Sequence, residues 1–258
     1  MKVSSSQQYS PNFGAKLISQ WKCVNGSGNP RNVSIVSFES SDLGFIKSFR
    51  DNLNRFSSLS ATQQAIIDAS TNTISAVLQN VNGAFEKVRM FMAIHDGKPC
   101  GFLIANIPKR LAGTNAETYS SRHNPAKNET EIDWLVTWSP NRNENIKGIG
   151  KAIVGEYFKT VCSDKFRDVF VRSEVPEKSN ALFFYQSMGF ERLGQKRIKL
   201  LTKNNGQCFA DIFSDPEDDV IPMIITRSSL KKKVEELSKK MCRCEFVKNS
   251  IDLEKIMY

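Results

Sequence analysis

Histidine is scarce in this sequence, because its 258 residues include only two, His95 and His123. Two histidines argue against a His-rich metal site, and they leave little basis for a Ser-His-Asp triad. His95 stands beside the turn sequence HDGK, so we predict that it is simply a residue at the end of a strand.

Long hydrophobic runs are also missing. The first residues, MKVSSSQQYSPNFGAKL, contain no apolar signal-peptide core, and no stretch approaches the length needed to cross a bilayer. The six cysteines are scattered, and the nearest pair, Cys242 and Cys244, lacks the CxxC spacing of zinc and redox sites. We therefore predict a cytoplasmic protein with reduced thiols and no membrane-embedded segment.

What the sequence does contain is typical of a folded domain with a basic surface. Hydrophobic residues make up 40% and charged residues 24%, which is enough for a real core. The length suits one large domain with additions or two small ones. The net charge of +9 favours a polyanionic partner, but it does not choose between nucleic acid, a membrane surface and a phosphorylated cofactor.

Hydrophobic periodicity and turn residues predict an alternation of strands and helices. The predicted strands cover 32–40, a hairpin over 87–107 with an Asp-Gly turn, 131–138, 167–175, and segments within 190–194 and 219–227. The predicted helices cover 40–53, 59–81, 147–162, 178–190 and a lysine-rich segment over 228–244. We divide the chain into a flexible leader (1–30), a main domain (31–226) with insertions over 108–130 and 194–219, and a basic amphipathic helical tail (227–258).

The strand–helix–strand unit over 131–175 is predicted to be a right-handed crossover between parallel strands. Its helix opens with two glycines, Gly148 and Gly150, between Lys147 and Lys151. The unpaired N–H groups and the dipole of a helix N-terminus favour an anion at this point. A Walker A loop is excluded because the required glycine and Ser/Thr are absent, and Ile153 argues against a dinucleotide fingerprint.

A second motif follows the next strand, where Asn180 and Ala181 precede Tyr185, and Gly189 and Phe190 close the helix. Together, KGIGKAIV and the N-A-x-x-x-Y-x-x-x-G-F pattern resemble the GNAT N-acetyltransferases. The resemblance covers roughly 32–226. It implies an α/β (α+β mixed) three-layer fold, in which helices flank a mixed, splayed central sheet, plus a C-terminal helical extension.

The same resemblance implies roles for individual residues toward acetyl-CoA. Asn180 matches the family asparagine that contacts the pantetheine arm, and Tyr185 matches the tyrosine that protonates the departing thiolate. Asn145 stands where the family has Arg or Gln, so backbone donors are expected to carry more of the cofactor binding. The implied cofactor-binding residues are Val136, Trp138, Asn145, Lys147, Gly148, Ile149, Gly150, Lys151 and Asn180.

The implied mechanism is direct attack of an amine on the thioester without an acyl-enzyme. Backbone N–H groups over 134–138 would stabilise the oxyanion. Glu131 and Asp133 are candidate bases, with Glu174 as a third. Strict alternation predicts that Glu131 and Asp133 share a face with Leu135 and Thr137, opposite Ile132, Trp134 and Val136.

The function predicted from these residues is acetyl transfer from acetyl-CoA to a primary amine of a protein lysine, a protein N-terminus or a small polyamine. Two alternatives stay open. One is a coenzyme A-binding regulatory module that has lost catalysis, and the other is a basic protein that binds nucleic acid through its lysines. We expect no membrane partner and a monomer or homodimer.

Overall fold

The computed structural model describes residues 16–38, 43–52, 59–79, 88–106, 129–140, 144–163, 170–176, 180–192 and 220–239. The insertion predicted over 194–219 lies outside these residues, as does the loop over 108–130 apart from its last two positions. The first fifteen residues and the tail beyond residue 239 also lie outside them.

Within the described residues, nine strands form one mixed sheet in the order β6-β1-β2-β3-β4-β5-β7-β9-β8. The pairing of β5 with β7 is parallel, and each of the other described ladders is antiparallel. The strands are β1 Lys16–Asn25, β2 Pro30–Ser37, β3 Val88–His95, β4 Lys98–Asn106, β5 Glu129–Thr137, β6 Ile146–Lys147, β7 Phe170–Pro176, β8 Glu191–Arg192 and β9 Val220–Ile225.

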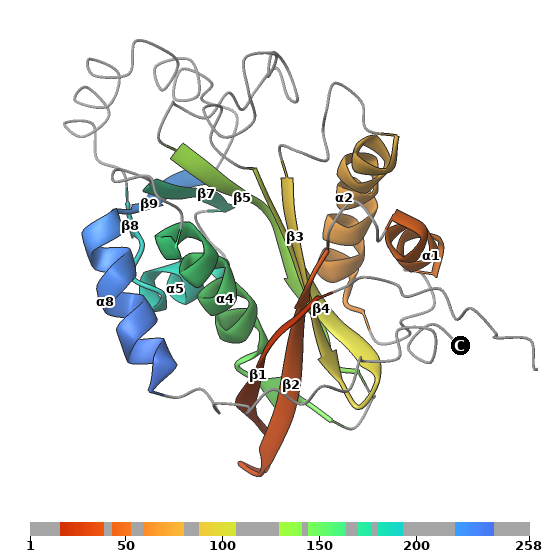
Figure 1. The fold of residues 1–258 in the computed structure, drawn as a ribbon, viewed down its shortest axis with the longest axis horizontal. Helices are drawn as coiled ribbons and strands as arrows, with labels where there is room; N and C mark the ends of the chain where they lie inside the picture. The colour runs from red at the N-terminus through yellow and green to blue at the C-terminus, as the bar shows by residue number, and fades with distance from the viewer. Residues whose placement is uncertain are drawn as a thin grey trace, which may run out of the picture.

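Helices cover both faces of this sheet, so the predicted three-layer arrangement is confirmed (Figure 1). On one face lie α1 (Leu43–Asn52) and α2 (Ala61–Leu78), which pack on a core cluster that includes Phe102, Ile104 and Trp138. On the other face lie α4 (Ile149–Ser163), α5 (Asn180–Ser187) and α8 (Arg227–Ser238). None of the described helices is long and apolar enough to span a membrane.

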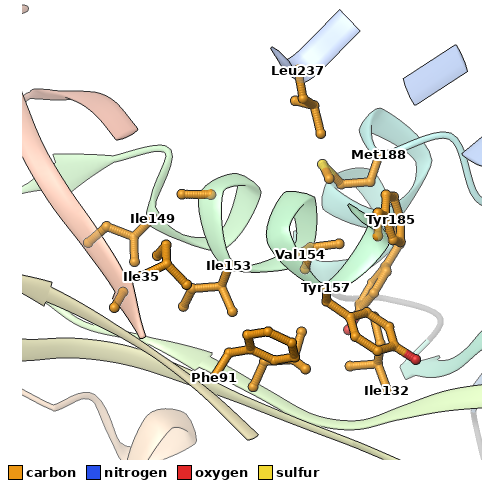
Figure 2. Packing of buried hydrophobic residues seen from close by; sticks show 14 of the residues in the cluster. Ile35, Phe91, Ile132, Ile149, Ile153, Val154, Tyr157, Tyr185, Met188 and Leu237 are labelled. Atoms are coloured by element: carbon orange, nitrogen blue, oxygen red, sulfur yellow. The ribbon is translucent and has the colours of Figure 1, made fainter. Parts of the chain in front are cut away.

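Helix α4 is the centre of the second core (Figure 2). Figure 2 shows Ile153, Val154 and Tyr157 of α4 among side chains from the sheet, including Phe91 and Ile132. All five residues that periodicity predicted for the inner side of this helix are buried, namely Ile149, Ile153, Val154, Tyr157 and Val161. The prediction that parallel strands flank this helix is also confirmed, because α4 lies between the parallel strands β5 and β7 in the chain.

The prediction of a flexible leader over 1–30 was wrong for its second half. Residues 16–25 form β1, which pairs along its length with β2 and carries Trp21 and Cys23 into the core. A turn joins the two strands, in which the Asn25 side chain accepts hydrogen bonds from the backbone N–H groups of Ser27 and Asn29. The many Ser, Asn and Gly residues that suggested a loose leader therefore belong partly to a tight hairpin turn.

The hairpin predicted over 87–107 is confirmed as β3 and β4. Its turn places Asp96 at φ 47° and Gly97 at φ 71°, both in the left-handed region that the Asp-Gly sequence favours. Helix α8 also follows its predicted spacing, since Leu230 and Leu237 are buried and Val234 packs against the same core as α4. This helix is thus part of the main core, although the division of the chain at residue 226 stays a prediction.

Candidate functional site

Strands β5 and β7 diverge after a short parallel ladder. Their pairs run only from Glu129 with Phe170 to Glu131 with Arg172. Beyond this point β5 continues beside β4 alone, and β7 pairs with β9. The edge of β5 that faces away from β4 therefore has no strand partner among the described residues after Glu131. The structure thus contains the splay that the resemblance implied.

The register decides which backbone groups of β5 point to this open edge. Trp138 donates its N–H to the carbonyl oxygen of Cys100 on β4, at 2.9 Å. Hydrogen-bonding directions alternate along a strand, so Val136 also faces β4, whereas Leu135 and Thr137 face the opening. The Thr137 carbonyl accepts a hydrogen bond from Gln63 Nε2 of α2, which confirms its outward direction. The N–H groups of Leu135 and Thr137 therefore point to the open edge.

The prediction that Ile132 lies on the same face as Trp134 and Val136, opposite Leu135 and Thr137, was wrong. Ile104 pairs with Trp134 while its neighbour Ala105 pairs with Ile132, so Asp133 is an extra residue in a β-bulge. The bulge interrupts the alternation of side chains. As a result, Ile132 lies in the core beneath α4, whereas Trp134 and Val136 lie in the core beneath α1 and α2.

The candidate bases occupy different environments. Glu131 is only 2% exposed and belongs to the last pair of the parallel ladder. Asp133 is partly exposed and lies at the bulge where the opening begins. Glu174 is a residue of β7, and its side chain lies outside what the structure describes. Asp133 is thus the half-buried candidate whose place in the chain is next to the opening.

The glycine loop forms the start of α4. Gly148 has φ 98°, a left-handed conformation that side chains rarely adopt, and its carbonyl accepts the first helical hydrogen bond from the N–H of Ala152, at 2.9 Å. The N–H groups from Ile149 to Lys151 are therefore those of a helix N-terminus, without partners inside the helix. The side chains of Asn145, Lys147 and Lys151 are exposed around this N-terminus.

Gly150 brings the N-terminus of α4 next to the open edge of β5. A Cβ atom at Gly150 would lie 3.2 Å from Cε2 of Phe184 on α5 and 3.8 Å from Cγ2 of Thr137 on β5. The helix N-terminus, the end of the open strand and α5 consequently meet at this glycine. Phe184 is a residue of this junction that sequence reasoning missed, and the only sequence signal for it is its place directly before Tyr185.

Tyr185 is 6% exposed and packs in the core beneath α5, in the same cluster as Val154 and Met188 (Figure 2). Its ring makes edge contacts with Phe184 and Phe190, with centroids 5.2 and 5.1 Å apart. The ring is therefore held in one place by aromatic neighbours. Asn180, by contrast, is the exposed first residue of α5.

A buried thiol lies under the glycine loop. Cys23 Sγ is 3.6 Å from the position that a Cβ atom at Gly148 would occupy. Burial raises the pKa of the Cys23 thiol to about 11. The pKa of Cys100 is raised mainly by burial and to a smaller extent by the nearby Cys23. Both thiols therefore stay protonated at neutral pH, which does not suit a cysteine nucleophile.

We accordingly expect Cys23 to resist alkylation in the folded protein. With a pKa of about 11, roughly one thousandth of the thiol is ionised at pH 8, so modification by iodoacetamide should be more than about 100-fold slower than for a free cysteine. Mass spectrometry of peptides labelled under native and unfolding conditions measures this for each cysteine. Native labelling of Cys23 at the rate of a model thiol would contradict the buried position.

Among the described residues, no group of three His, Cys, Asp or Glu side chains could hold a metal ion. What the described residues offer instead is an open strand edge beside a helix N-terminus. A strand edge can pair with an extended ligand that contains amide groups, and a helix N-terminus can bind an anion.

No known family profile and no curated protein matches this sequence. Solved structures do match it. The aminoglycoside acetyltransferase AAC(6')-Ib, in complex with coenzyme A and kanamycin, has a TM-score of 0.45 and 16% identity, covering 78% of this chain and 98% of its own. The GNAT domain of S. lividans PAT has a TM-score of 0.42 and 11% identity, covering 85% and 99%.

The PaiA N-acetyltransferase from Thermoplasma acidophilum, in complex with coenzyme A, has a TM-score of 0.39 and 16% identity, covering 74% of this chain and 97% of its own. At these identities and TM-scores, the similarity assigns neither an acceptor nor any site residue to this chain.

Proposed function

We propose that this protein is a GNAT-type N-acetyltransferase that transfers the acetyl group of acetyl-CoA to a primary amine. The observation that carries the proposal is the meeting of the open edge of β5 with the N-terminus of α4 at Gly150. Coenzyme A contains both matching chemistries, since its pantetheine arm is an extended chain with two amides and its diphosphate is an anion.

The residues that would hold the cofactor follow from these two features. The backbone of Leu135 and Thr137 would pair with the pantetheine arm, because the Trp138 N–H is used inside the sheet. The N–H groups of Ile149, Gly150 and Lys151 would bind the diphosphate. Lys147 and Lys151 would add positive charge, Asn145 would contribute a short polar side chain, and Asn180 would contact the arm from α5.

Acetyl-CoA supplies the activated thioester whose carbonyl carbon an amine attacks. An N–H of Leu135 or Thr137 would donate to the carbonyl oxygen as negative charge develops there. Tyr185 would protonate the sulfur as the C–S bond breaks, and Asp133 or Glu131 would accept the proton that the amine loses. The strand and helix backbones hold these donors in place before the reaction, which lowers the cost of orienting the reactants.

The binding step is tested by reversing one charge at the start of α4. We expect Lys151→Glu to weaken acetyl-CoA binding by at least about tenfold, because it places a carboxylate beside the diphosphate site. Lys151 is exposed, so the substitution should leave the fold intact. Isothermal titration calorimetry of acetyl-CoA into the wild type and the variant measures the dissociation constants.

Lys232→Glu is the matched control, since Lys232 is also exposed on a helix but belongs to α8. It changes the net charge equally, and we expect it to keep the wild-type affinity. If the folded wild type does not bind acetyl-CoA at millimolar concentrations, the proposed function is wrong. If both variants lose affinity equally, binding depends on the net charge of the protein and not on the glycine loop.

A further inference from the structure

Charged side chains from three places in the chain meet at the end of the sheet that precedes α4. Glu144, directly before the glycine loop, accepts a hydrogen bond from Arg31 Nε of β2. Its Oε1 also lies 3.6 Å from Nε2 of His95, the last residue of β3. Asp96 in the following turn places Oδ2 at 3.2 Å from the same nitrogen.

His95 is 3% exposed, and both of its ring nitrogens lie near oxygen atoms. Nδ1 lies 2.8 Å from the carbonyl oxygen of Asn32, and because a carbonyl only accepts, Nδ1 must carry a hydrogen. Nε2, on the other side of the ring, faces the carboxylates of Asp96 and Glu144.

This cluster is attached to the loop that opens α4. The two residues of β6, Ile146 and Lys147, pair with Asn25 and Val24 of β1. Glu144, two residues earlier, is bound by Arg31 of β2 and faces His95 of β3. The chain is therefore fixed to the sheet at Glu144 and again at β6, which lie on either side of Asn145 and just before Gly148.

We propose that Glu144, held by Arg31 beside His95, is a positioning residue that fixes the loop over 145–148 for binding of the coenzyme A diphosphate. This inference rests on the proposed function. Partly buried ion pairs contribute little net stability, because desolvation offsets their attraction, so the cluster is better explained by the geometry that it imposes. It acts through the backbone of the loop and not by contact with the ligand.

The sign of one substitution separates positioning from simple electrostatics. Glu144 is a negative charge near a predicted anion site, so its removal should strengthen acetyl-CoA binding if the charge acts only through space. If Glu144 positions the loop, its removal should weaken binding instead, because the loop must then be ordered when the ligand binds. Glu144→Gln keeps the size of the side chain and changes only its charge and hydrogen bonding.

We expect Glu144→Gln to raise the dissociation constant of acetyl-CoA by about tenfold or more. The same variant should have the wild-type kcat/KM for S-acetyl-pantetheine, which has the thioester and the amides but no diphosphate. Glu236→Gln is the matched control, since Glu236 forms an ion pair with Lys233 on α8 and its loss changes the net charge equally. We expect this control to leave both quantities unchanged.

Arg31→Gln and the double variant Arg31→Gln/Glu144→Gln complete a double-mutant cycle. If the pair acts as a unit, the double variant should bind acetyl-CoA no more weakly than the weaker single variant. Wild-type or tighter binding of acetyl-CoA by Glu144→Gln would overturn the positioning role and leave the proposed function standing. An equal loss of kcat/KM with S-acetyl-pantetheine would also overturn the positioning role. Failure of the wild type to bind acetyl-CoA would remove both proposals.

Discussion

Tyr185→Phe is expected to lower the turnover of acetyl-CoA with an amine acceptor by roughly 10²- to 10³-fold, while the dissociation constant of acetyl-CoA stays within about twofold of the wild type. The ring of Tyr185 packs edge-on against Phe184 and Phe190, and phenylalanine preserves both contacts. The substitution therefore removes only the hydroxyl that would protonate the departing thiolate. Release of the coenzyme A thiol, followed with a thiol reagent, measures turnover once a screen of amines has found an acceptor.

Tyr157→Phe is the matched control for this experiment. Tyr157 is also a buried tyrosine of the same core, but its hydroxyl forms a hydrogen bond with Thr130 Oγ1. Removing this hydroxyl leaves a buried Thr130 without that partner, so we expect a loss of about 1–3 kcal/mol of stability and little change in turnover. Equal losses of turnover and cofactor affinity in Tyr185→Phe would contradict a role as acid and leave Tyr185 a core aromatic residue.

The parts of the fold that could be predicted from the sequence are those set by local rules. The hairpin of β3 and β4 follows from two apolar runs around Asp-Gly, where the turn needs positive φ values. The inner side of α4 follows from the 3.6-residue period, and all five predicted residues are buried. The crossover from β5 to β7 follows from the rule that parallel strands need a connecting helix.

The errors arose where long-range pairing overrides local pattern. Residues 16–25 are polar enough to resemble a leader, yet pairing with β2 and burial of Trp21 and Cys23 make them a strand. Pairing with β4 likewise creates the bulge at Asp133, and no periodicity within β5 reveals an extra residue. The face of each candidate base therefore could not be predicted from alternation alone.

In the candidate site, too, the sequence indicated the local features and not those that depend on long-range pairing. The glycines at 148 and 150 are visible in the sequence, and the structure shows Gly148 in a left-handed conformation at the start of α4. The backbone donors on β5 depend on register, so Leu135 and Thr137 could not be separated from Val136 and Trp138 before the bond from Trp138 to Cys100 was known. The link from Glu144 to Arg31 spans 113 residues, a separation that no local motif reveals.

Gly155→Ala is expected to destabilise the protein by about 2 kcal/mol, which is opposite to the usual effect of this substitution in a helix. Within a helix, alanine is normally favoured over glycine by about 1 kcal/mol. At Gly155, however, a Cβ atom would lie 2.6 Å from Cη2 and 2.9 Å from Cζ2 of Trp21. Overpacking of this kind costs about 1–3 kcal/mol, and the cost reaches the upper end only if the ring cannot move.

Three contacts hold the Trp21 ring where it is. Its Nε1 donates to Glu156 Oε1 at 2.9 Å and to Ser19 Oγ at 3.0 Å, and Lys159 Nζ lies 5.7 Å from the ring centroid. Moving the ring would disturb these bonds around the buried carboxylate of Glu156, so the clash should outweigh the gain in helix propensity.

The measurement is thermal unfolding, in which a loss of about 2 kcal/mol corresponds to a decrease in Tm of roughly 4–8 °C for a domain of this size. Gly26→Ala is the matched control, because its Cβ atom would meet only Asn145 Cβ, at 4.0 Å, and Gly26 is not among the described glycines with positive φ. We expect that variant to unfold at the wild-type temperature or slightly above it. A Gly155→Ala variant as stable as Gly26→Ala would show that Trp21 can shift, and that its bonds to Glu156 and Ser19 do not fix β1 on α4.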